Sequence, residues 1–225
     1  MATIRDVTST LRTLIKQHTD DSHYSDEFLY HLMTNARSLL IERDYNKNKK
    51  LSSWNQQTYC VKLEKTKAHD CDCVPVGCDV LKSVYEIPKP LTFRGMDRIE
   101  VFTLGWERID YVRPDYQKEA LLDPVIANTS LHSVVNEKIT IWNNTKLPAI
   151  LVRGIFEDPT DWEGIQLCDE EGNETERPCF DTQNDNFPID NDLLILAYEM
   201  IMNMLKLPLS LTDDVTNDAS QEITT

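Results

Sequence analysis

Cysteines are the residues of this chain whose types and spacing come closest to a metal site. The 225 residues include six cysteines, and one region combines several of them with a histidine: Cys60, His69, Cys71, Cys73 and Cys78. Zinc in proteins prefers four Cys or His ligands, usually offered as two closely spaced pairs. This region offers C-x-C followed by C-x4-C, but no second C-x2-C pair. Two readings stay open, a structural zinc site at these five residues or small thiols in a constrained loop. We expect no metal and keep zinc as the alternative.

Carboxylates are the second group with chemical potential. They gather in two clusters, one with Glu157, Asp158, Asp161 and Glu163, the other with Asp181, Asn184, Asp185 and Asn186. Oxygen ligands of this kind suit calcium, but the order does not match the EF-hand loop, which also needs a central glycine. General acid–base catalysis needs carboxylates beside a substrate pocket, and no nucleophile or base stands out near them. A hydrolase therefore remains a third hypothesis without assigned catalytic residues.

The absence of several well-known motifs excludes the common enzyme classes. Only six glycines are present, and the sequence contains no GxGxxG, GxxxxGK[ST], GxSxG or HExxH motif. We expect no enzyme activity, no catalytic or cofactor-binding residues and no cofactor. The first residues lack the features of a signal peptide, and the longest apolar run, 193–205, is too interrupted to span a membrane. We therefore expect a protein made in the cytoplasm, with reduced thiols and no membrane contact.

Charge is distributed unevenly along the chain. Residues 1–156 hold 21 Lys+Arg and 20 Asp+Glu, whereas residues 157–225 hold 2 and 18. Within the first part, eight cations and three anions fall between Arg37 and Lys67. Such asymmetry indicates interaction surfaces, and the acidic part would repel the phosphates of nucleic acid. Segments 37–67 and 157–225 are candidates for complementary faces between neighbouring molecules. The simpler reading is a solvated acidic face.

Hydrophobic periodicity places these residues on helices, strands and loops. Apolar residues at three- and four-residue steps predict helices at 4–17, 25–44 and 192–205, the last apolar on nearly every side and hence buried. Strand patterns cover 59–64, 80–85, 98–104, 107–112, 137–142 and 147–156. Gly105-Trp106 reads as a tight turn between paired strands, and 137–142 with 147–156 reads as the clearest hairpin. Residues 157–187, which are acidic and short of apolar residues, read as a long loop with local structure.

The order helix, helix, β-rich middle, helix predicts an α+β fold. We expect the helices of the two termini to form a helical bundle, made of residues 1–50 and 188–208. The β-rich region 51–187 would project from this bundle as an insertion. Residues 209–225 would follow as an acidic C-terminal tail.

Several segments together give the chain a resemblance to a known family. They are SDEFLYHLMTNARSLLIERDYNKNKKLSSWNQQTYCVKLEKTK, the cysteine-rich DCDCVPVGCDVLKS and YEIPKPL, followed by a hairpin region, a late apolar helix and an acidic tail. In this order the segments resemble the head–tail adaptor, or connector ring, proteins of short-tailed bacteriophages. The resemblance is closest to the portal-proximal ring protein of crAss-like phages, and it covers roughly residues 1–205.

The resemblance implies a structural protein of the virion at the head–tail junction, made in the host cytoplasm. About 12 copies would form a homo-oligomeric ring that joins the portal protein to other tail or ring proteins. Genomic DNA would pass through the channel of this ring without sequence-specific binding. The resemblance implies no catalytic residues, and for the fold it implies a helical bundle with a β-rich insertion. The alternative, from a different class, is a zinc-stabilised interaction or regulatory module built on Cys60, Cys71, Cys73 and Cys78.

Overall fold

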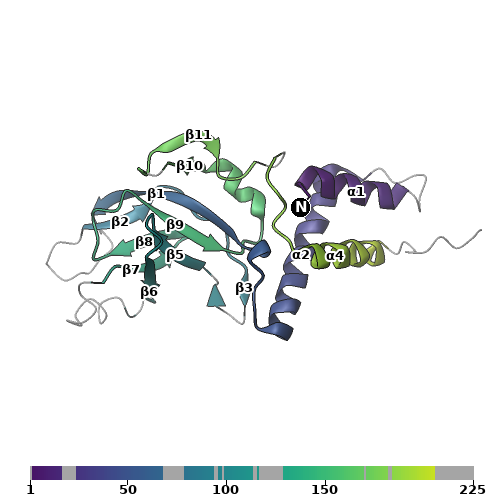
Figure 1. Cartoon of the computed structure of the whole chain (residues 1–225), viewed down its shortest axis with the longest axis horizontal. Helices are drawn as coiled ribbons and strands as arrows, with labels where there is room; N and C mark the ends of the chain where they lie inside the picture. The colour runs from purple at the N-terminus through teal and green to yellow at the C-terminus, as the bar shows by residue number, and fades with distance from the viewer. Residues whose placement is uncertain are drawn as a thin grey trace, which may run out of the picture.

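A computed structural model gives the arrangement of most of the chain. It describes residues 2–16, 24–67, 79–93, 96–97, 99–113, 116, 129–169, 171–181 and 184–205. The described part has two neighbouring regions, a β-barrel and a group of helices at one end of it (Figure 1). The long axis of the molecule runs from the barrel to the helices.

The helices begin at residues that cap them well. α1 (Ile4–Lys16) buries one apolar face. α2 (Asp26–Asn48) begins after Ser25, whose hydroxyl accepts the backbone N–H of Phe28 at 3.2 Å, and ends at Lys49 in the left-handed conformation. α4 (Asn191–Met204) begins after Asp190, whose carboxylate accepts the backbone N–H of Asp192. The three predicted helices are confirmed, although α2 continues beyond its expected end at Asp44.

Seven strands close into a barrel in the order β1-β2-β8-β7-β6-β5-β9. Their bounds are β1 (Gln57–Lys67), β2 (Asp79–Ser83), β5 (Ile99–Thr103), β6 (Arg108–Tyr111), β7 (Leu131–Val135), β8 (Lys138–Trp142) and β9 (Ala149–Gly154). Neighbouring strands are antiparallel except β6 and β7, which pair in parallel. Alternate side chains such as Val61, Val101, Ile139, Ile141 and Val152 are fully buried and form the core of the barrel.

β1 connects the two ends of the molecule. Its first part, Gln57 to Lys62, pairs with β9, and its second part, Leu63 to Lys67, pairs with β2. Gln57 lies opposite Gly154, near the helices, and the strand runs from there to the far end of the barrel (Figure 1). The same strand therefore contributes to both halves of the barrel wall.

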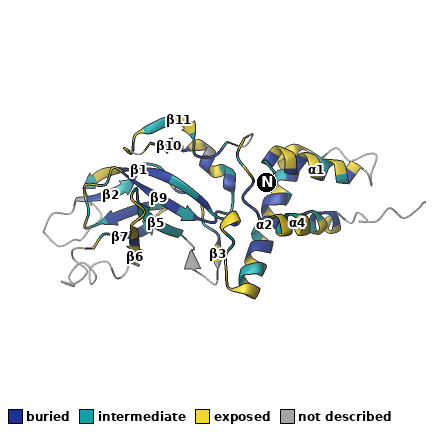
Figure 2. Ribbon diagram, in the orientation of Figure 1, coloured by how far each residue is buried: buried dark blue, intermediate teal, exposed yellow. Residues whose placement is uncertain are grey.

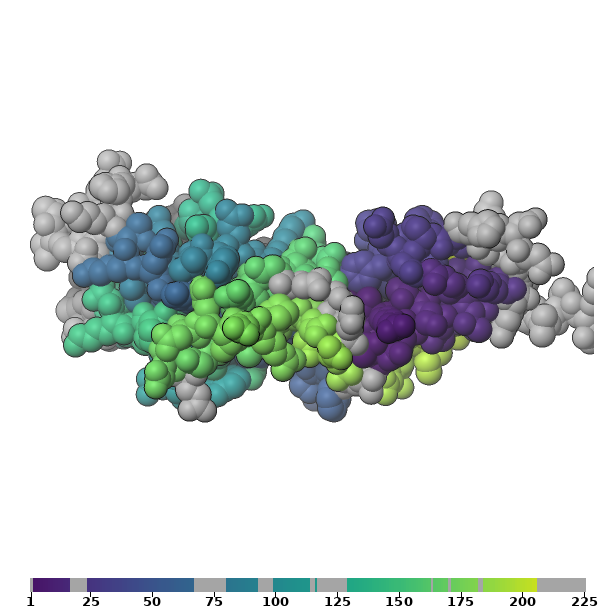
Figure 3. All heavy atoms as spheres, turned by 90° about the horizontal axis from the view of Figure 1, so that it is seen from above, coloured from purple at the N-terminus to yellow at the C-terminus, as the bar shows by residue number. Residues whose placement is uncertain are grey.

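An acidic segment lies along the outside of the barrel. We call it the strap, and it consists of the described residues between 157 and 181. It contains a short helix, η3 (Pro159–Gly164), and a hairpin of β10 (Gln166–Cys168) and β11 (Glu174–Pro178). Seen from above, the strap runs over one face of the molecule toward the helices (Figure 3). A smaller hairpin of β3 (Thr92–Phe93) and β4 (Met96–Asp97) lies between the barrel and α2.

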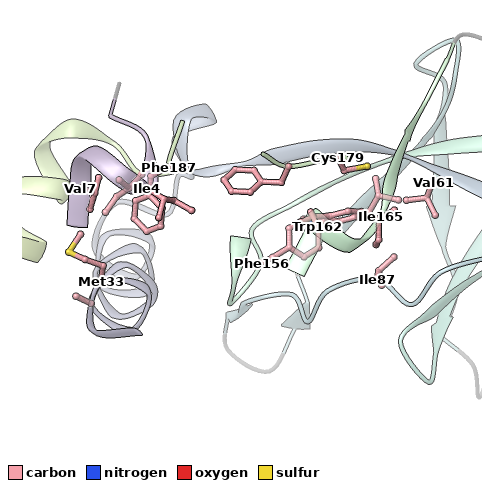
Figure 4. Packing of buried hydrophobic residues seen from close by; sticks show 14 of the residues in the cluster. Ile4, Val7, Met33, Val61, Ile87, Phe156, Trp162, Ile165, Cys179 and Phe187 are labelled. Carbon is pink, nitrogen blue, oxygen red and sulfur yellow. The ribbon is translucent and has the colours of Figure 1, made fainter. Parts of the chain in front are cut away.

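A buried tryptophan joins the strap to the barrel. Trp162 in η3 is fully buried, with its ring 4.6 Å from that of Tyr59 in β1 and 4.9 Å from that of Phe156. Ile165 and Cys179 of the strap pack in the same place, as Figure 4 shows. The hydrophobic core is continuous from here to the side chains buried between the helices.

The fold class predicted from the sequence is wrong. We expected an α+β fold in which the helices of the two termini form a bundle and the β-rich region is an insertion. The body of the molecule is instead a closed seven-stranded barrel, and the helices lie at one end of it (Figure 1). Closure depends on pairs between strands distant in sequence, such as β1 with β9, and periodicity does not show which strands pair.

Two local predictions are also wrong. β8 and β9 do not form the expected hairpin, because β8 pairs with β7 and β2 whereas β9 pairs with β1 and β5. The tight turn lies before β8, where Asn136 and Glu137 both have positive φ. α4 is not buried on most sides: its fully buried residues are Ala197, Ile201 and Met202. The turn at Gly105-Trp106 between β5 and β6 is confirmed.

Candidate interaction surfaces

The predicted zinc ligands fall in different parts of the chain. Cys60 lies in β1 and is buried, whereas His69, Cys71, Cys73 and Cys78 lie outside the described residues. Among the residues that the structure describes, no group of three or more His, Cys, Asp or Glu side chains could hold a metal ion. The zinc site and its metal-free alternative therefore both stay predictions.

Cys60 belongs to a cluster of three free thiols that the sequence did not predict. The Sγ of Cys168 donates a hydrogen bond to the backbone oxygen of Cys60 at 3.4 Å, and the Sγ of Cys179 lies 3.9 Å from the same oxygen. The hydrogen bond between the Cys60 and Cys168 side chains, together with burial, raises the pKa of Cys60; the same bond lowers the pKa of Cys168. Burial raises the pKa of Cys179 to about 12. The cluster holds the strap against β1.

The predicted carboxylate clusters act as caps and turns. Asp158 caps η3 by accepting the backbone N–H of Thr160 at 2.8 Å, and it also accepts the hydroxyl of Tyr30 in α2 at 2.5 Å. Burial and this bond raise the pKa of Tyr30. Asp185 accepts a hydrogen bond from Arg177 at 2.9 Å. Asp158 thus fixes the strap to α2, and Asp185 fixes the strap to the segment that follows it.

Arg37 joins the helices to the barrel. Its side chain is fully buried, and its guanidinium donates to three backbone carbonyls: Pro188 at 2.8 Å, Phe156 at 2.8 Å and Asn55 at 3.3 Å. The guanidinium carbon also lies 5.9 Å from the centre of the Phe187 ring. Burial lowers its pKa to about 10, so the group stays charged at neutral pH. The expected basic face of segment 37–67 therefore does not include Arg37, because its side chain is buried.

The other cations of segment 37–67 lie at two separate places. Arg43, Lys47, Lys49 and Lys50 lie on the last turns of α2 and just after it, whereas Lys62, Lys65 and Lys67 lie on β1. Lys62 forms an ion pair with Glu174 of the strap at 3.7 Å. One part of the segment is therefore already paired with the acidic part of the same chain, and the part on α2 remains exposed.

A groove lies between α2 and α4, which we call the α2–α4 groove. It has a volume of about 750 Å³ and is lined by Leu39, Leu40, Arg43, Asp44 and Lys47 from α2, and by Leu193, Leu196, Glu199, Met200, Asn203 and Met204 from α4. Leu39, Leu196 and Met204 are 42%, 45% and 51% exposed. Exposed residues follow both helices in Figure 2. An apolar groove with methionines and charged edges is the usual form of a protein-binding site.

A second exposed apolar surface lies on the outer wall of the barrel. We call it the Trp106 patch, and it consists of Phe102, Trp106 and Arg153. The Arg153 guanidinium lies 5.3 Å from the centre of the Phe102 ring and 5.2 Å from that of Trp106, and Trp106 is 54% exposed. Thr103 holds the turn through hydrogen bonds with the backbone of Trp106 and Glu107. A rigid tryptophan beside an arginine is typical of residues that contribute most to protein binding.

The strap presents mainly acidic side chains to solvent. Asp161, Asp169, Glu171 and Glu176 are exposed, and the described cation of the strap, Arg177, is paired with Asp185. Exposed carboxylates on one face repel polyanions and attract basic surfaces. No helix in the described ranges is long and apolar enough to cross a membrane.

Comparison with known protein families gives one match over nearly the whole chain. A family model described as phage tail ring protein 2 matches residues 4–223. No curated protein matches the chain. The matched range includes the barrel, the strap, the helices and almost all of the C-terminal segment.

Proposed function

Because this chain belongs to the phage tail ring protein 2 family of crAss-like phages, we propose that it is a head–tail adaptor whose copies close into a ring. Membership in the family makes it a structural protein of the phage tail, and hence of the virion. The proposal adds the position of the ring, below the portal, and its role of joining the capsid to the tail. It assigns no catalytic residue to the chain.

The observation that carries the proposal is the pair of different exposed apolar surfaces. Subunits of a ring meet through two unlike surfaces, since each copy contacts one neighbour with one surface and the other neighbour with another. The α2–α4 groove lies at the helical end of the molecule, whereas the Trp106 patch lies on the barrel wall. β5 begins opposite Gly154, near the helices, and ends at Thr103, so the turn that carries Trp106 is at the far end of this strand. The two surfaces are therefore well separated.

The strap supports a role beside DNA. Genomic DNA must move through a connector without binding tightly to its wall, and an acidic wall repels the phosphates of the DNA. We propose that the exposed carboxylates of the strap face the channel, and that the DNA is neither bound tightly nor read by sequence. The exposed cations at the end of α2, including Arg43 and Lys47, would then face other protein surfaces.

The remaining partners follow from the position of the ring. We propose about 12 copies, which contact the portal protein on one side and other ring or tail proteins on the other. The portal-proximal position is the most specific part of the proposal. It predicts that this chain contacts the portal protein directly, with no other ring between them.

Cryo-EM of the particle that contains this chain tests the proposal. We expect copies related by rotation about a channel wide enough for double-stranded DNA, with the strap on the channel wall. A monomer or a simple dimer in the particle would contradict the ring. Basic residues of this chain on the channel wall, with the strap turned outward, would contradict the role of the strap and leave the ring intact.

A further inference from the structure

We propose that the α2–α4 groove of each copy binds the C-terminal segment, residues 206–225, of a neighbouring copy. This inference rests on the proposed ring and names the occupant of one of the two surfaces through which its subunits meet.

The groove has the character of an interface that needs a partner. The helices that line it leave Leu39, Leu196 and Met204 about half exposed, and these side chains are grouped in one open groove rather than scattered. Within the part of the chain that the structure describes, α2 and α4 line this groove and α1 packs elsewhere against α2. Burying apolar surface stabilises a complex by about 25 cal/mol per Å². A segment with several aliphatic side chains would therefore gain by covering the groove.

The C-terminal segment has the matching composition. It reads KLPLSLTDDVTNDASQEITT, with leucines at 207, 209 and 211 before its acidic residues Asp213, Asp214, Asp218 and Glu222. The family match extends to residue 223, so nearly all of this segment belongs to what the family shares. The segment supplies aliphatic side chains first and carboxylates afterwards.

Charge at the groove complements these carboxylates. Arg43 and Lys47 lie four residues apart on α2, both are exposed, and neither forms an ion pair with any described residue. Asp44, between them, accepts a hydrogen bond from Asn48 at 2.6 Å. Lys49 and Lys50 continue the positive charge beyond the helix. Leucines in the groove would place the following carboxylates where these cations can pair with them.

The neighbouring copy is the occupant that suits a ring. The segment begins at the end of the groove, directly after α4, and its 20 residues can reach at most about 65 Å when extended. Such a reach is about twice the roughly 30 Å diameter of a small domain, so the segment is long enough to extend beyond its own copy. If each copy gives its segment to one neighbour and receives one from the other, the contact repeats around the ring and closes it.

A binding experiment with a synthetic peptide tests the site. The peptide carries residues 206–225, and the protein is the chain that ends at residue 205, which keeps every described core contact. We expect saturable binding, weakened more than about tenfold by Leu196→Asp in the groove and measurably by Arg43→Glu. Ile195→Asp is the matched control, because Ile195 is 58% exposed on the same helix but does not line the groove. All variants must keep the wild-type thermal unfolding midpoint.

The result that overturns the site is equally direct. Absence of binding would exclude the groove as the place for this segment, and so would equal binding to the Leu196→Asp and Ile195→Asp variants. A peptide with the same residues in scrambled order should bind weakly. Strong binding of the scrambled peptide would show that composition alone is recognised, and this too would overturn the proposed site.

A mixing experiment tests whether the segment of one copy reaches the groove of another. The full-length Leu196→Asp variant has a segment but a blocked groove, and the chain ending at residue 205 has a groove but no segment. We expect the two to form a 1:1 complex by mass photometry, whereas each alone stays monomeric. Failure to form the complex, when the peptide does bind, would mean that a segment attached to one copy does not reach the groove of another, and this would overturn the contact between neighbours.

The same measurements keep this inference apart from the proposed function. If the particle contains a ring but the chain ending at residue 205 joins it normally, the groove proposal fails and the ring stands. If the particle contains no ring of this chain, the proposed function fails, and peptide binding still decides whether the groove accepts the segment.

Discussion

The guanidinium of Arg37 donates to the backbone carbonyl of Phe156 over 2.8 Å and thereby links the middle of α2 to the residue that leaves the barrel after β9. Two further carbonyls, of Pro188 and Asn55, accept from the same group. Three chain segments that are distant in sequence thus meet at one buried side chain. The helical end of the molecule and the barrel are held in a fixed arrangement by this contact.

Replacing Arg37 should therefore destabilise the whole chain. Arg37→Met keeps most of the apolar volume but leaves three buried carbonyls without donors, which we expect to lower the free energy of unfolding by about 3 kcal/mol. Urea denaturation followed by tryptophan fluorescence measures this. Arg43→Met is the control, since Arg43 is exposed on the same helix and should change stability by less than about 0.5 kcal/mol. Equal stability of the two variants would contradict the role of Arg37.

His132 should make stability depend on pH below neutrality. It is buried in β7 with its Nδ1 2.8 Å from the carbonyl oxygen of Ile109, and burial lowers its pKa from 6.5 to about 4. Between these values the unfolded chain binds a proton that the folded chain does not, so stability falls as pH decreases from 6.5 to 4. The loss reaches about 3 kcal/mol. His132→Asn, which can still donate to Ile109, should flatten this part of the stability curve; an unchanged slope would assign the pH dependence to other groups.

The three clustered thiols should differ in reactivity. Cys60 and Cys179 have raised pKa values, whereas the hydrogen bond with Cys60 lowers that of Cys168. Because the thiolate is the reactive form, we expect iodoacetamide to modify Cys168 before the other two in the folded chain. Mass spectrometry of the separate peptides measures the order. In the chain unfolded by urea, all three cysteines should react at similar rates. If Cys168 still reacted first in urea, the local sequence rather than the cluster would control the order of modification.

Replacing Gly172 of the strap by alanine, which adds one methyl group, should destabilise the chain. Gly172 has φ +84°, and a Cβ at this position would lie 2.9 Å from Cβ of Pro148. Gly172→Ala should therefore destabilise the chain by about 1–3 kcal/mol, measured as a lower thermal unfolding midpoint. Gly164→Ala is the matched control, because a Cβ added there would meet nothing within 4 Å and φ at Gly164 is not positive. A similar loss in both variants would exclude the contact with Pro148 as the cause.

The helices could be predicted from the sequence because their information is local. Ser25 and Asp190, which are of residue types that favour helix N-termini, cap α2 and α4, and the apolar periodicity of each helix is plain in the sequence. Most strand positions were also predictable. The pairing was not, since the turn at Asn136 and Glu137 lacks the glycine that usually marks a hairpin. Because nothing in the sequence marks that turn, the pairing of β8 with β7 and the closure of the barrel cannot be predicted from the strand patterns.

The residues of the internal contacts and of the candidate surfaces were only partly visible in the sequence. Arg37 lies four residues after Met33 and three before Leu40, and therefore on the apolar side of α2. This position is the feature of the sequence that indicates its burial. The thiol cluster joins Cys60 to residues more than a hundred positions away, and nothing local indicates it. The α2–α4 groove cannot be predicted from the sequence, because its shape depends on how α2 and α4 pack against each other. The exposed Leu196 and Met204 look like core residues in a sequence that is apolar almost all round.

The continuity of β1 has a mechanical consequence. The strand starts beside the helices and ends at the opposite end of the barrel, and it is bonded first to β9 and then to β2 along its length. Backbone hydrogen bonds in antiparallel pairs lie perpendicular to the strands. A pull between the two ends of the molecule therefore loads many of these bonds in shear at once, instead of opening them one by one. A subunit built in this way should resist stretching along its long axis, a property that suits the proposed position of the ring between capsid and tail.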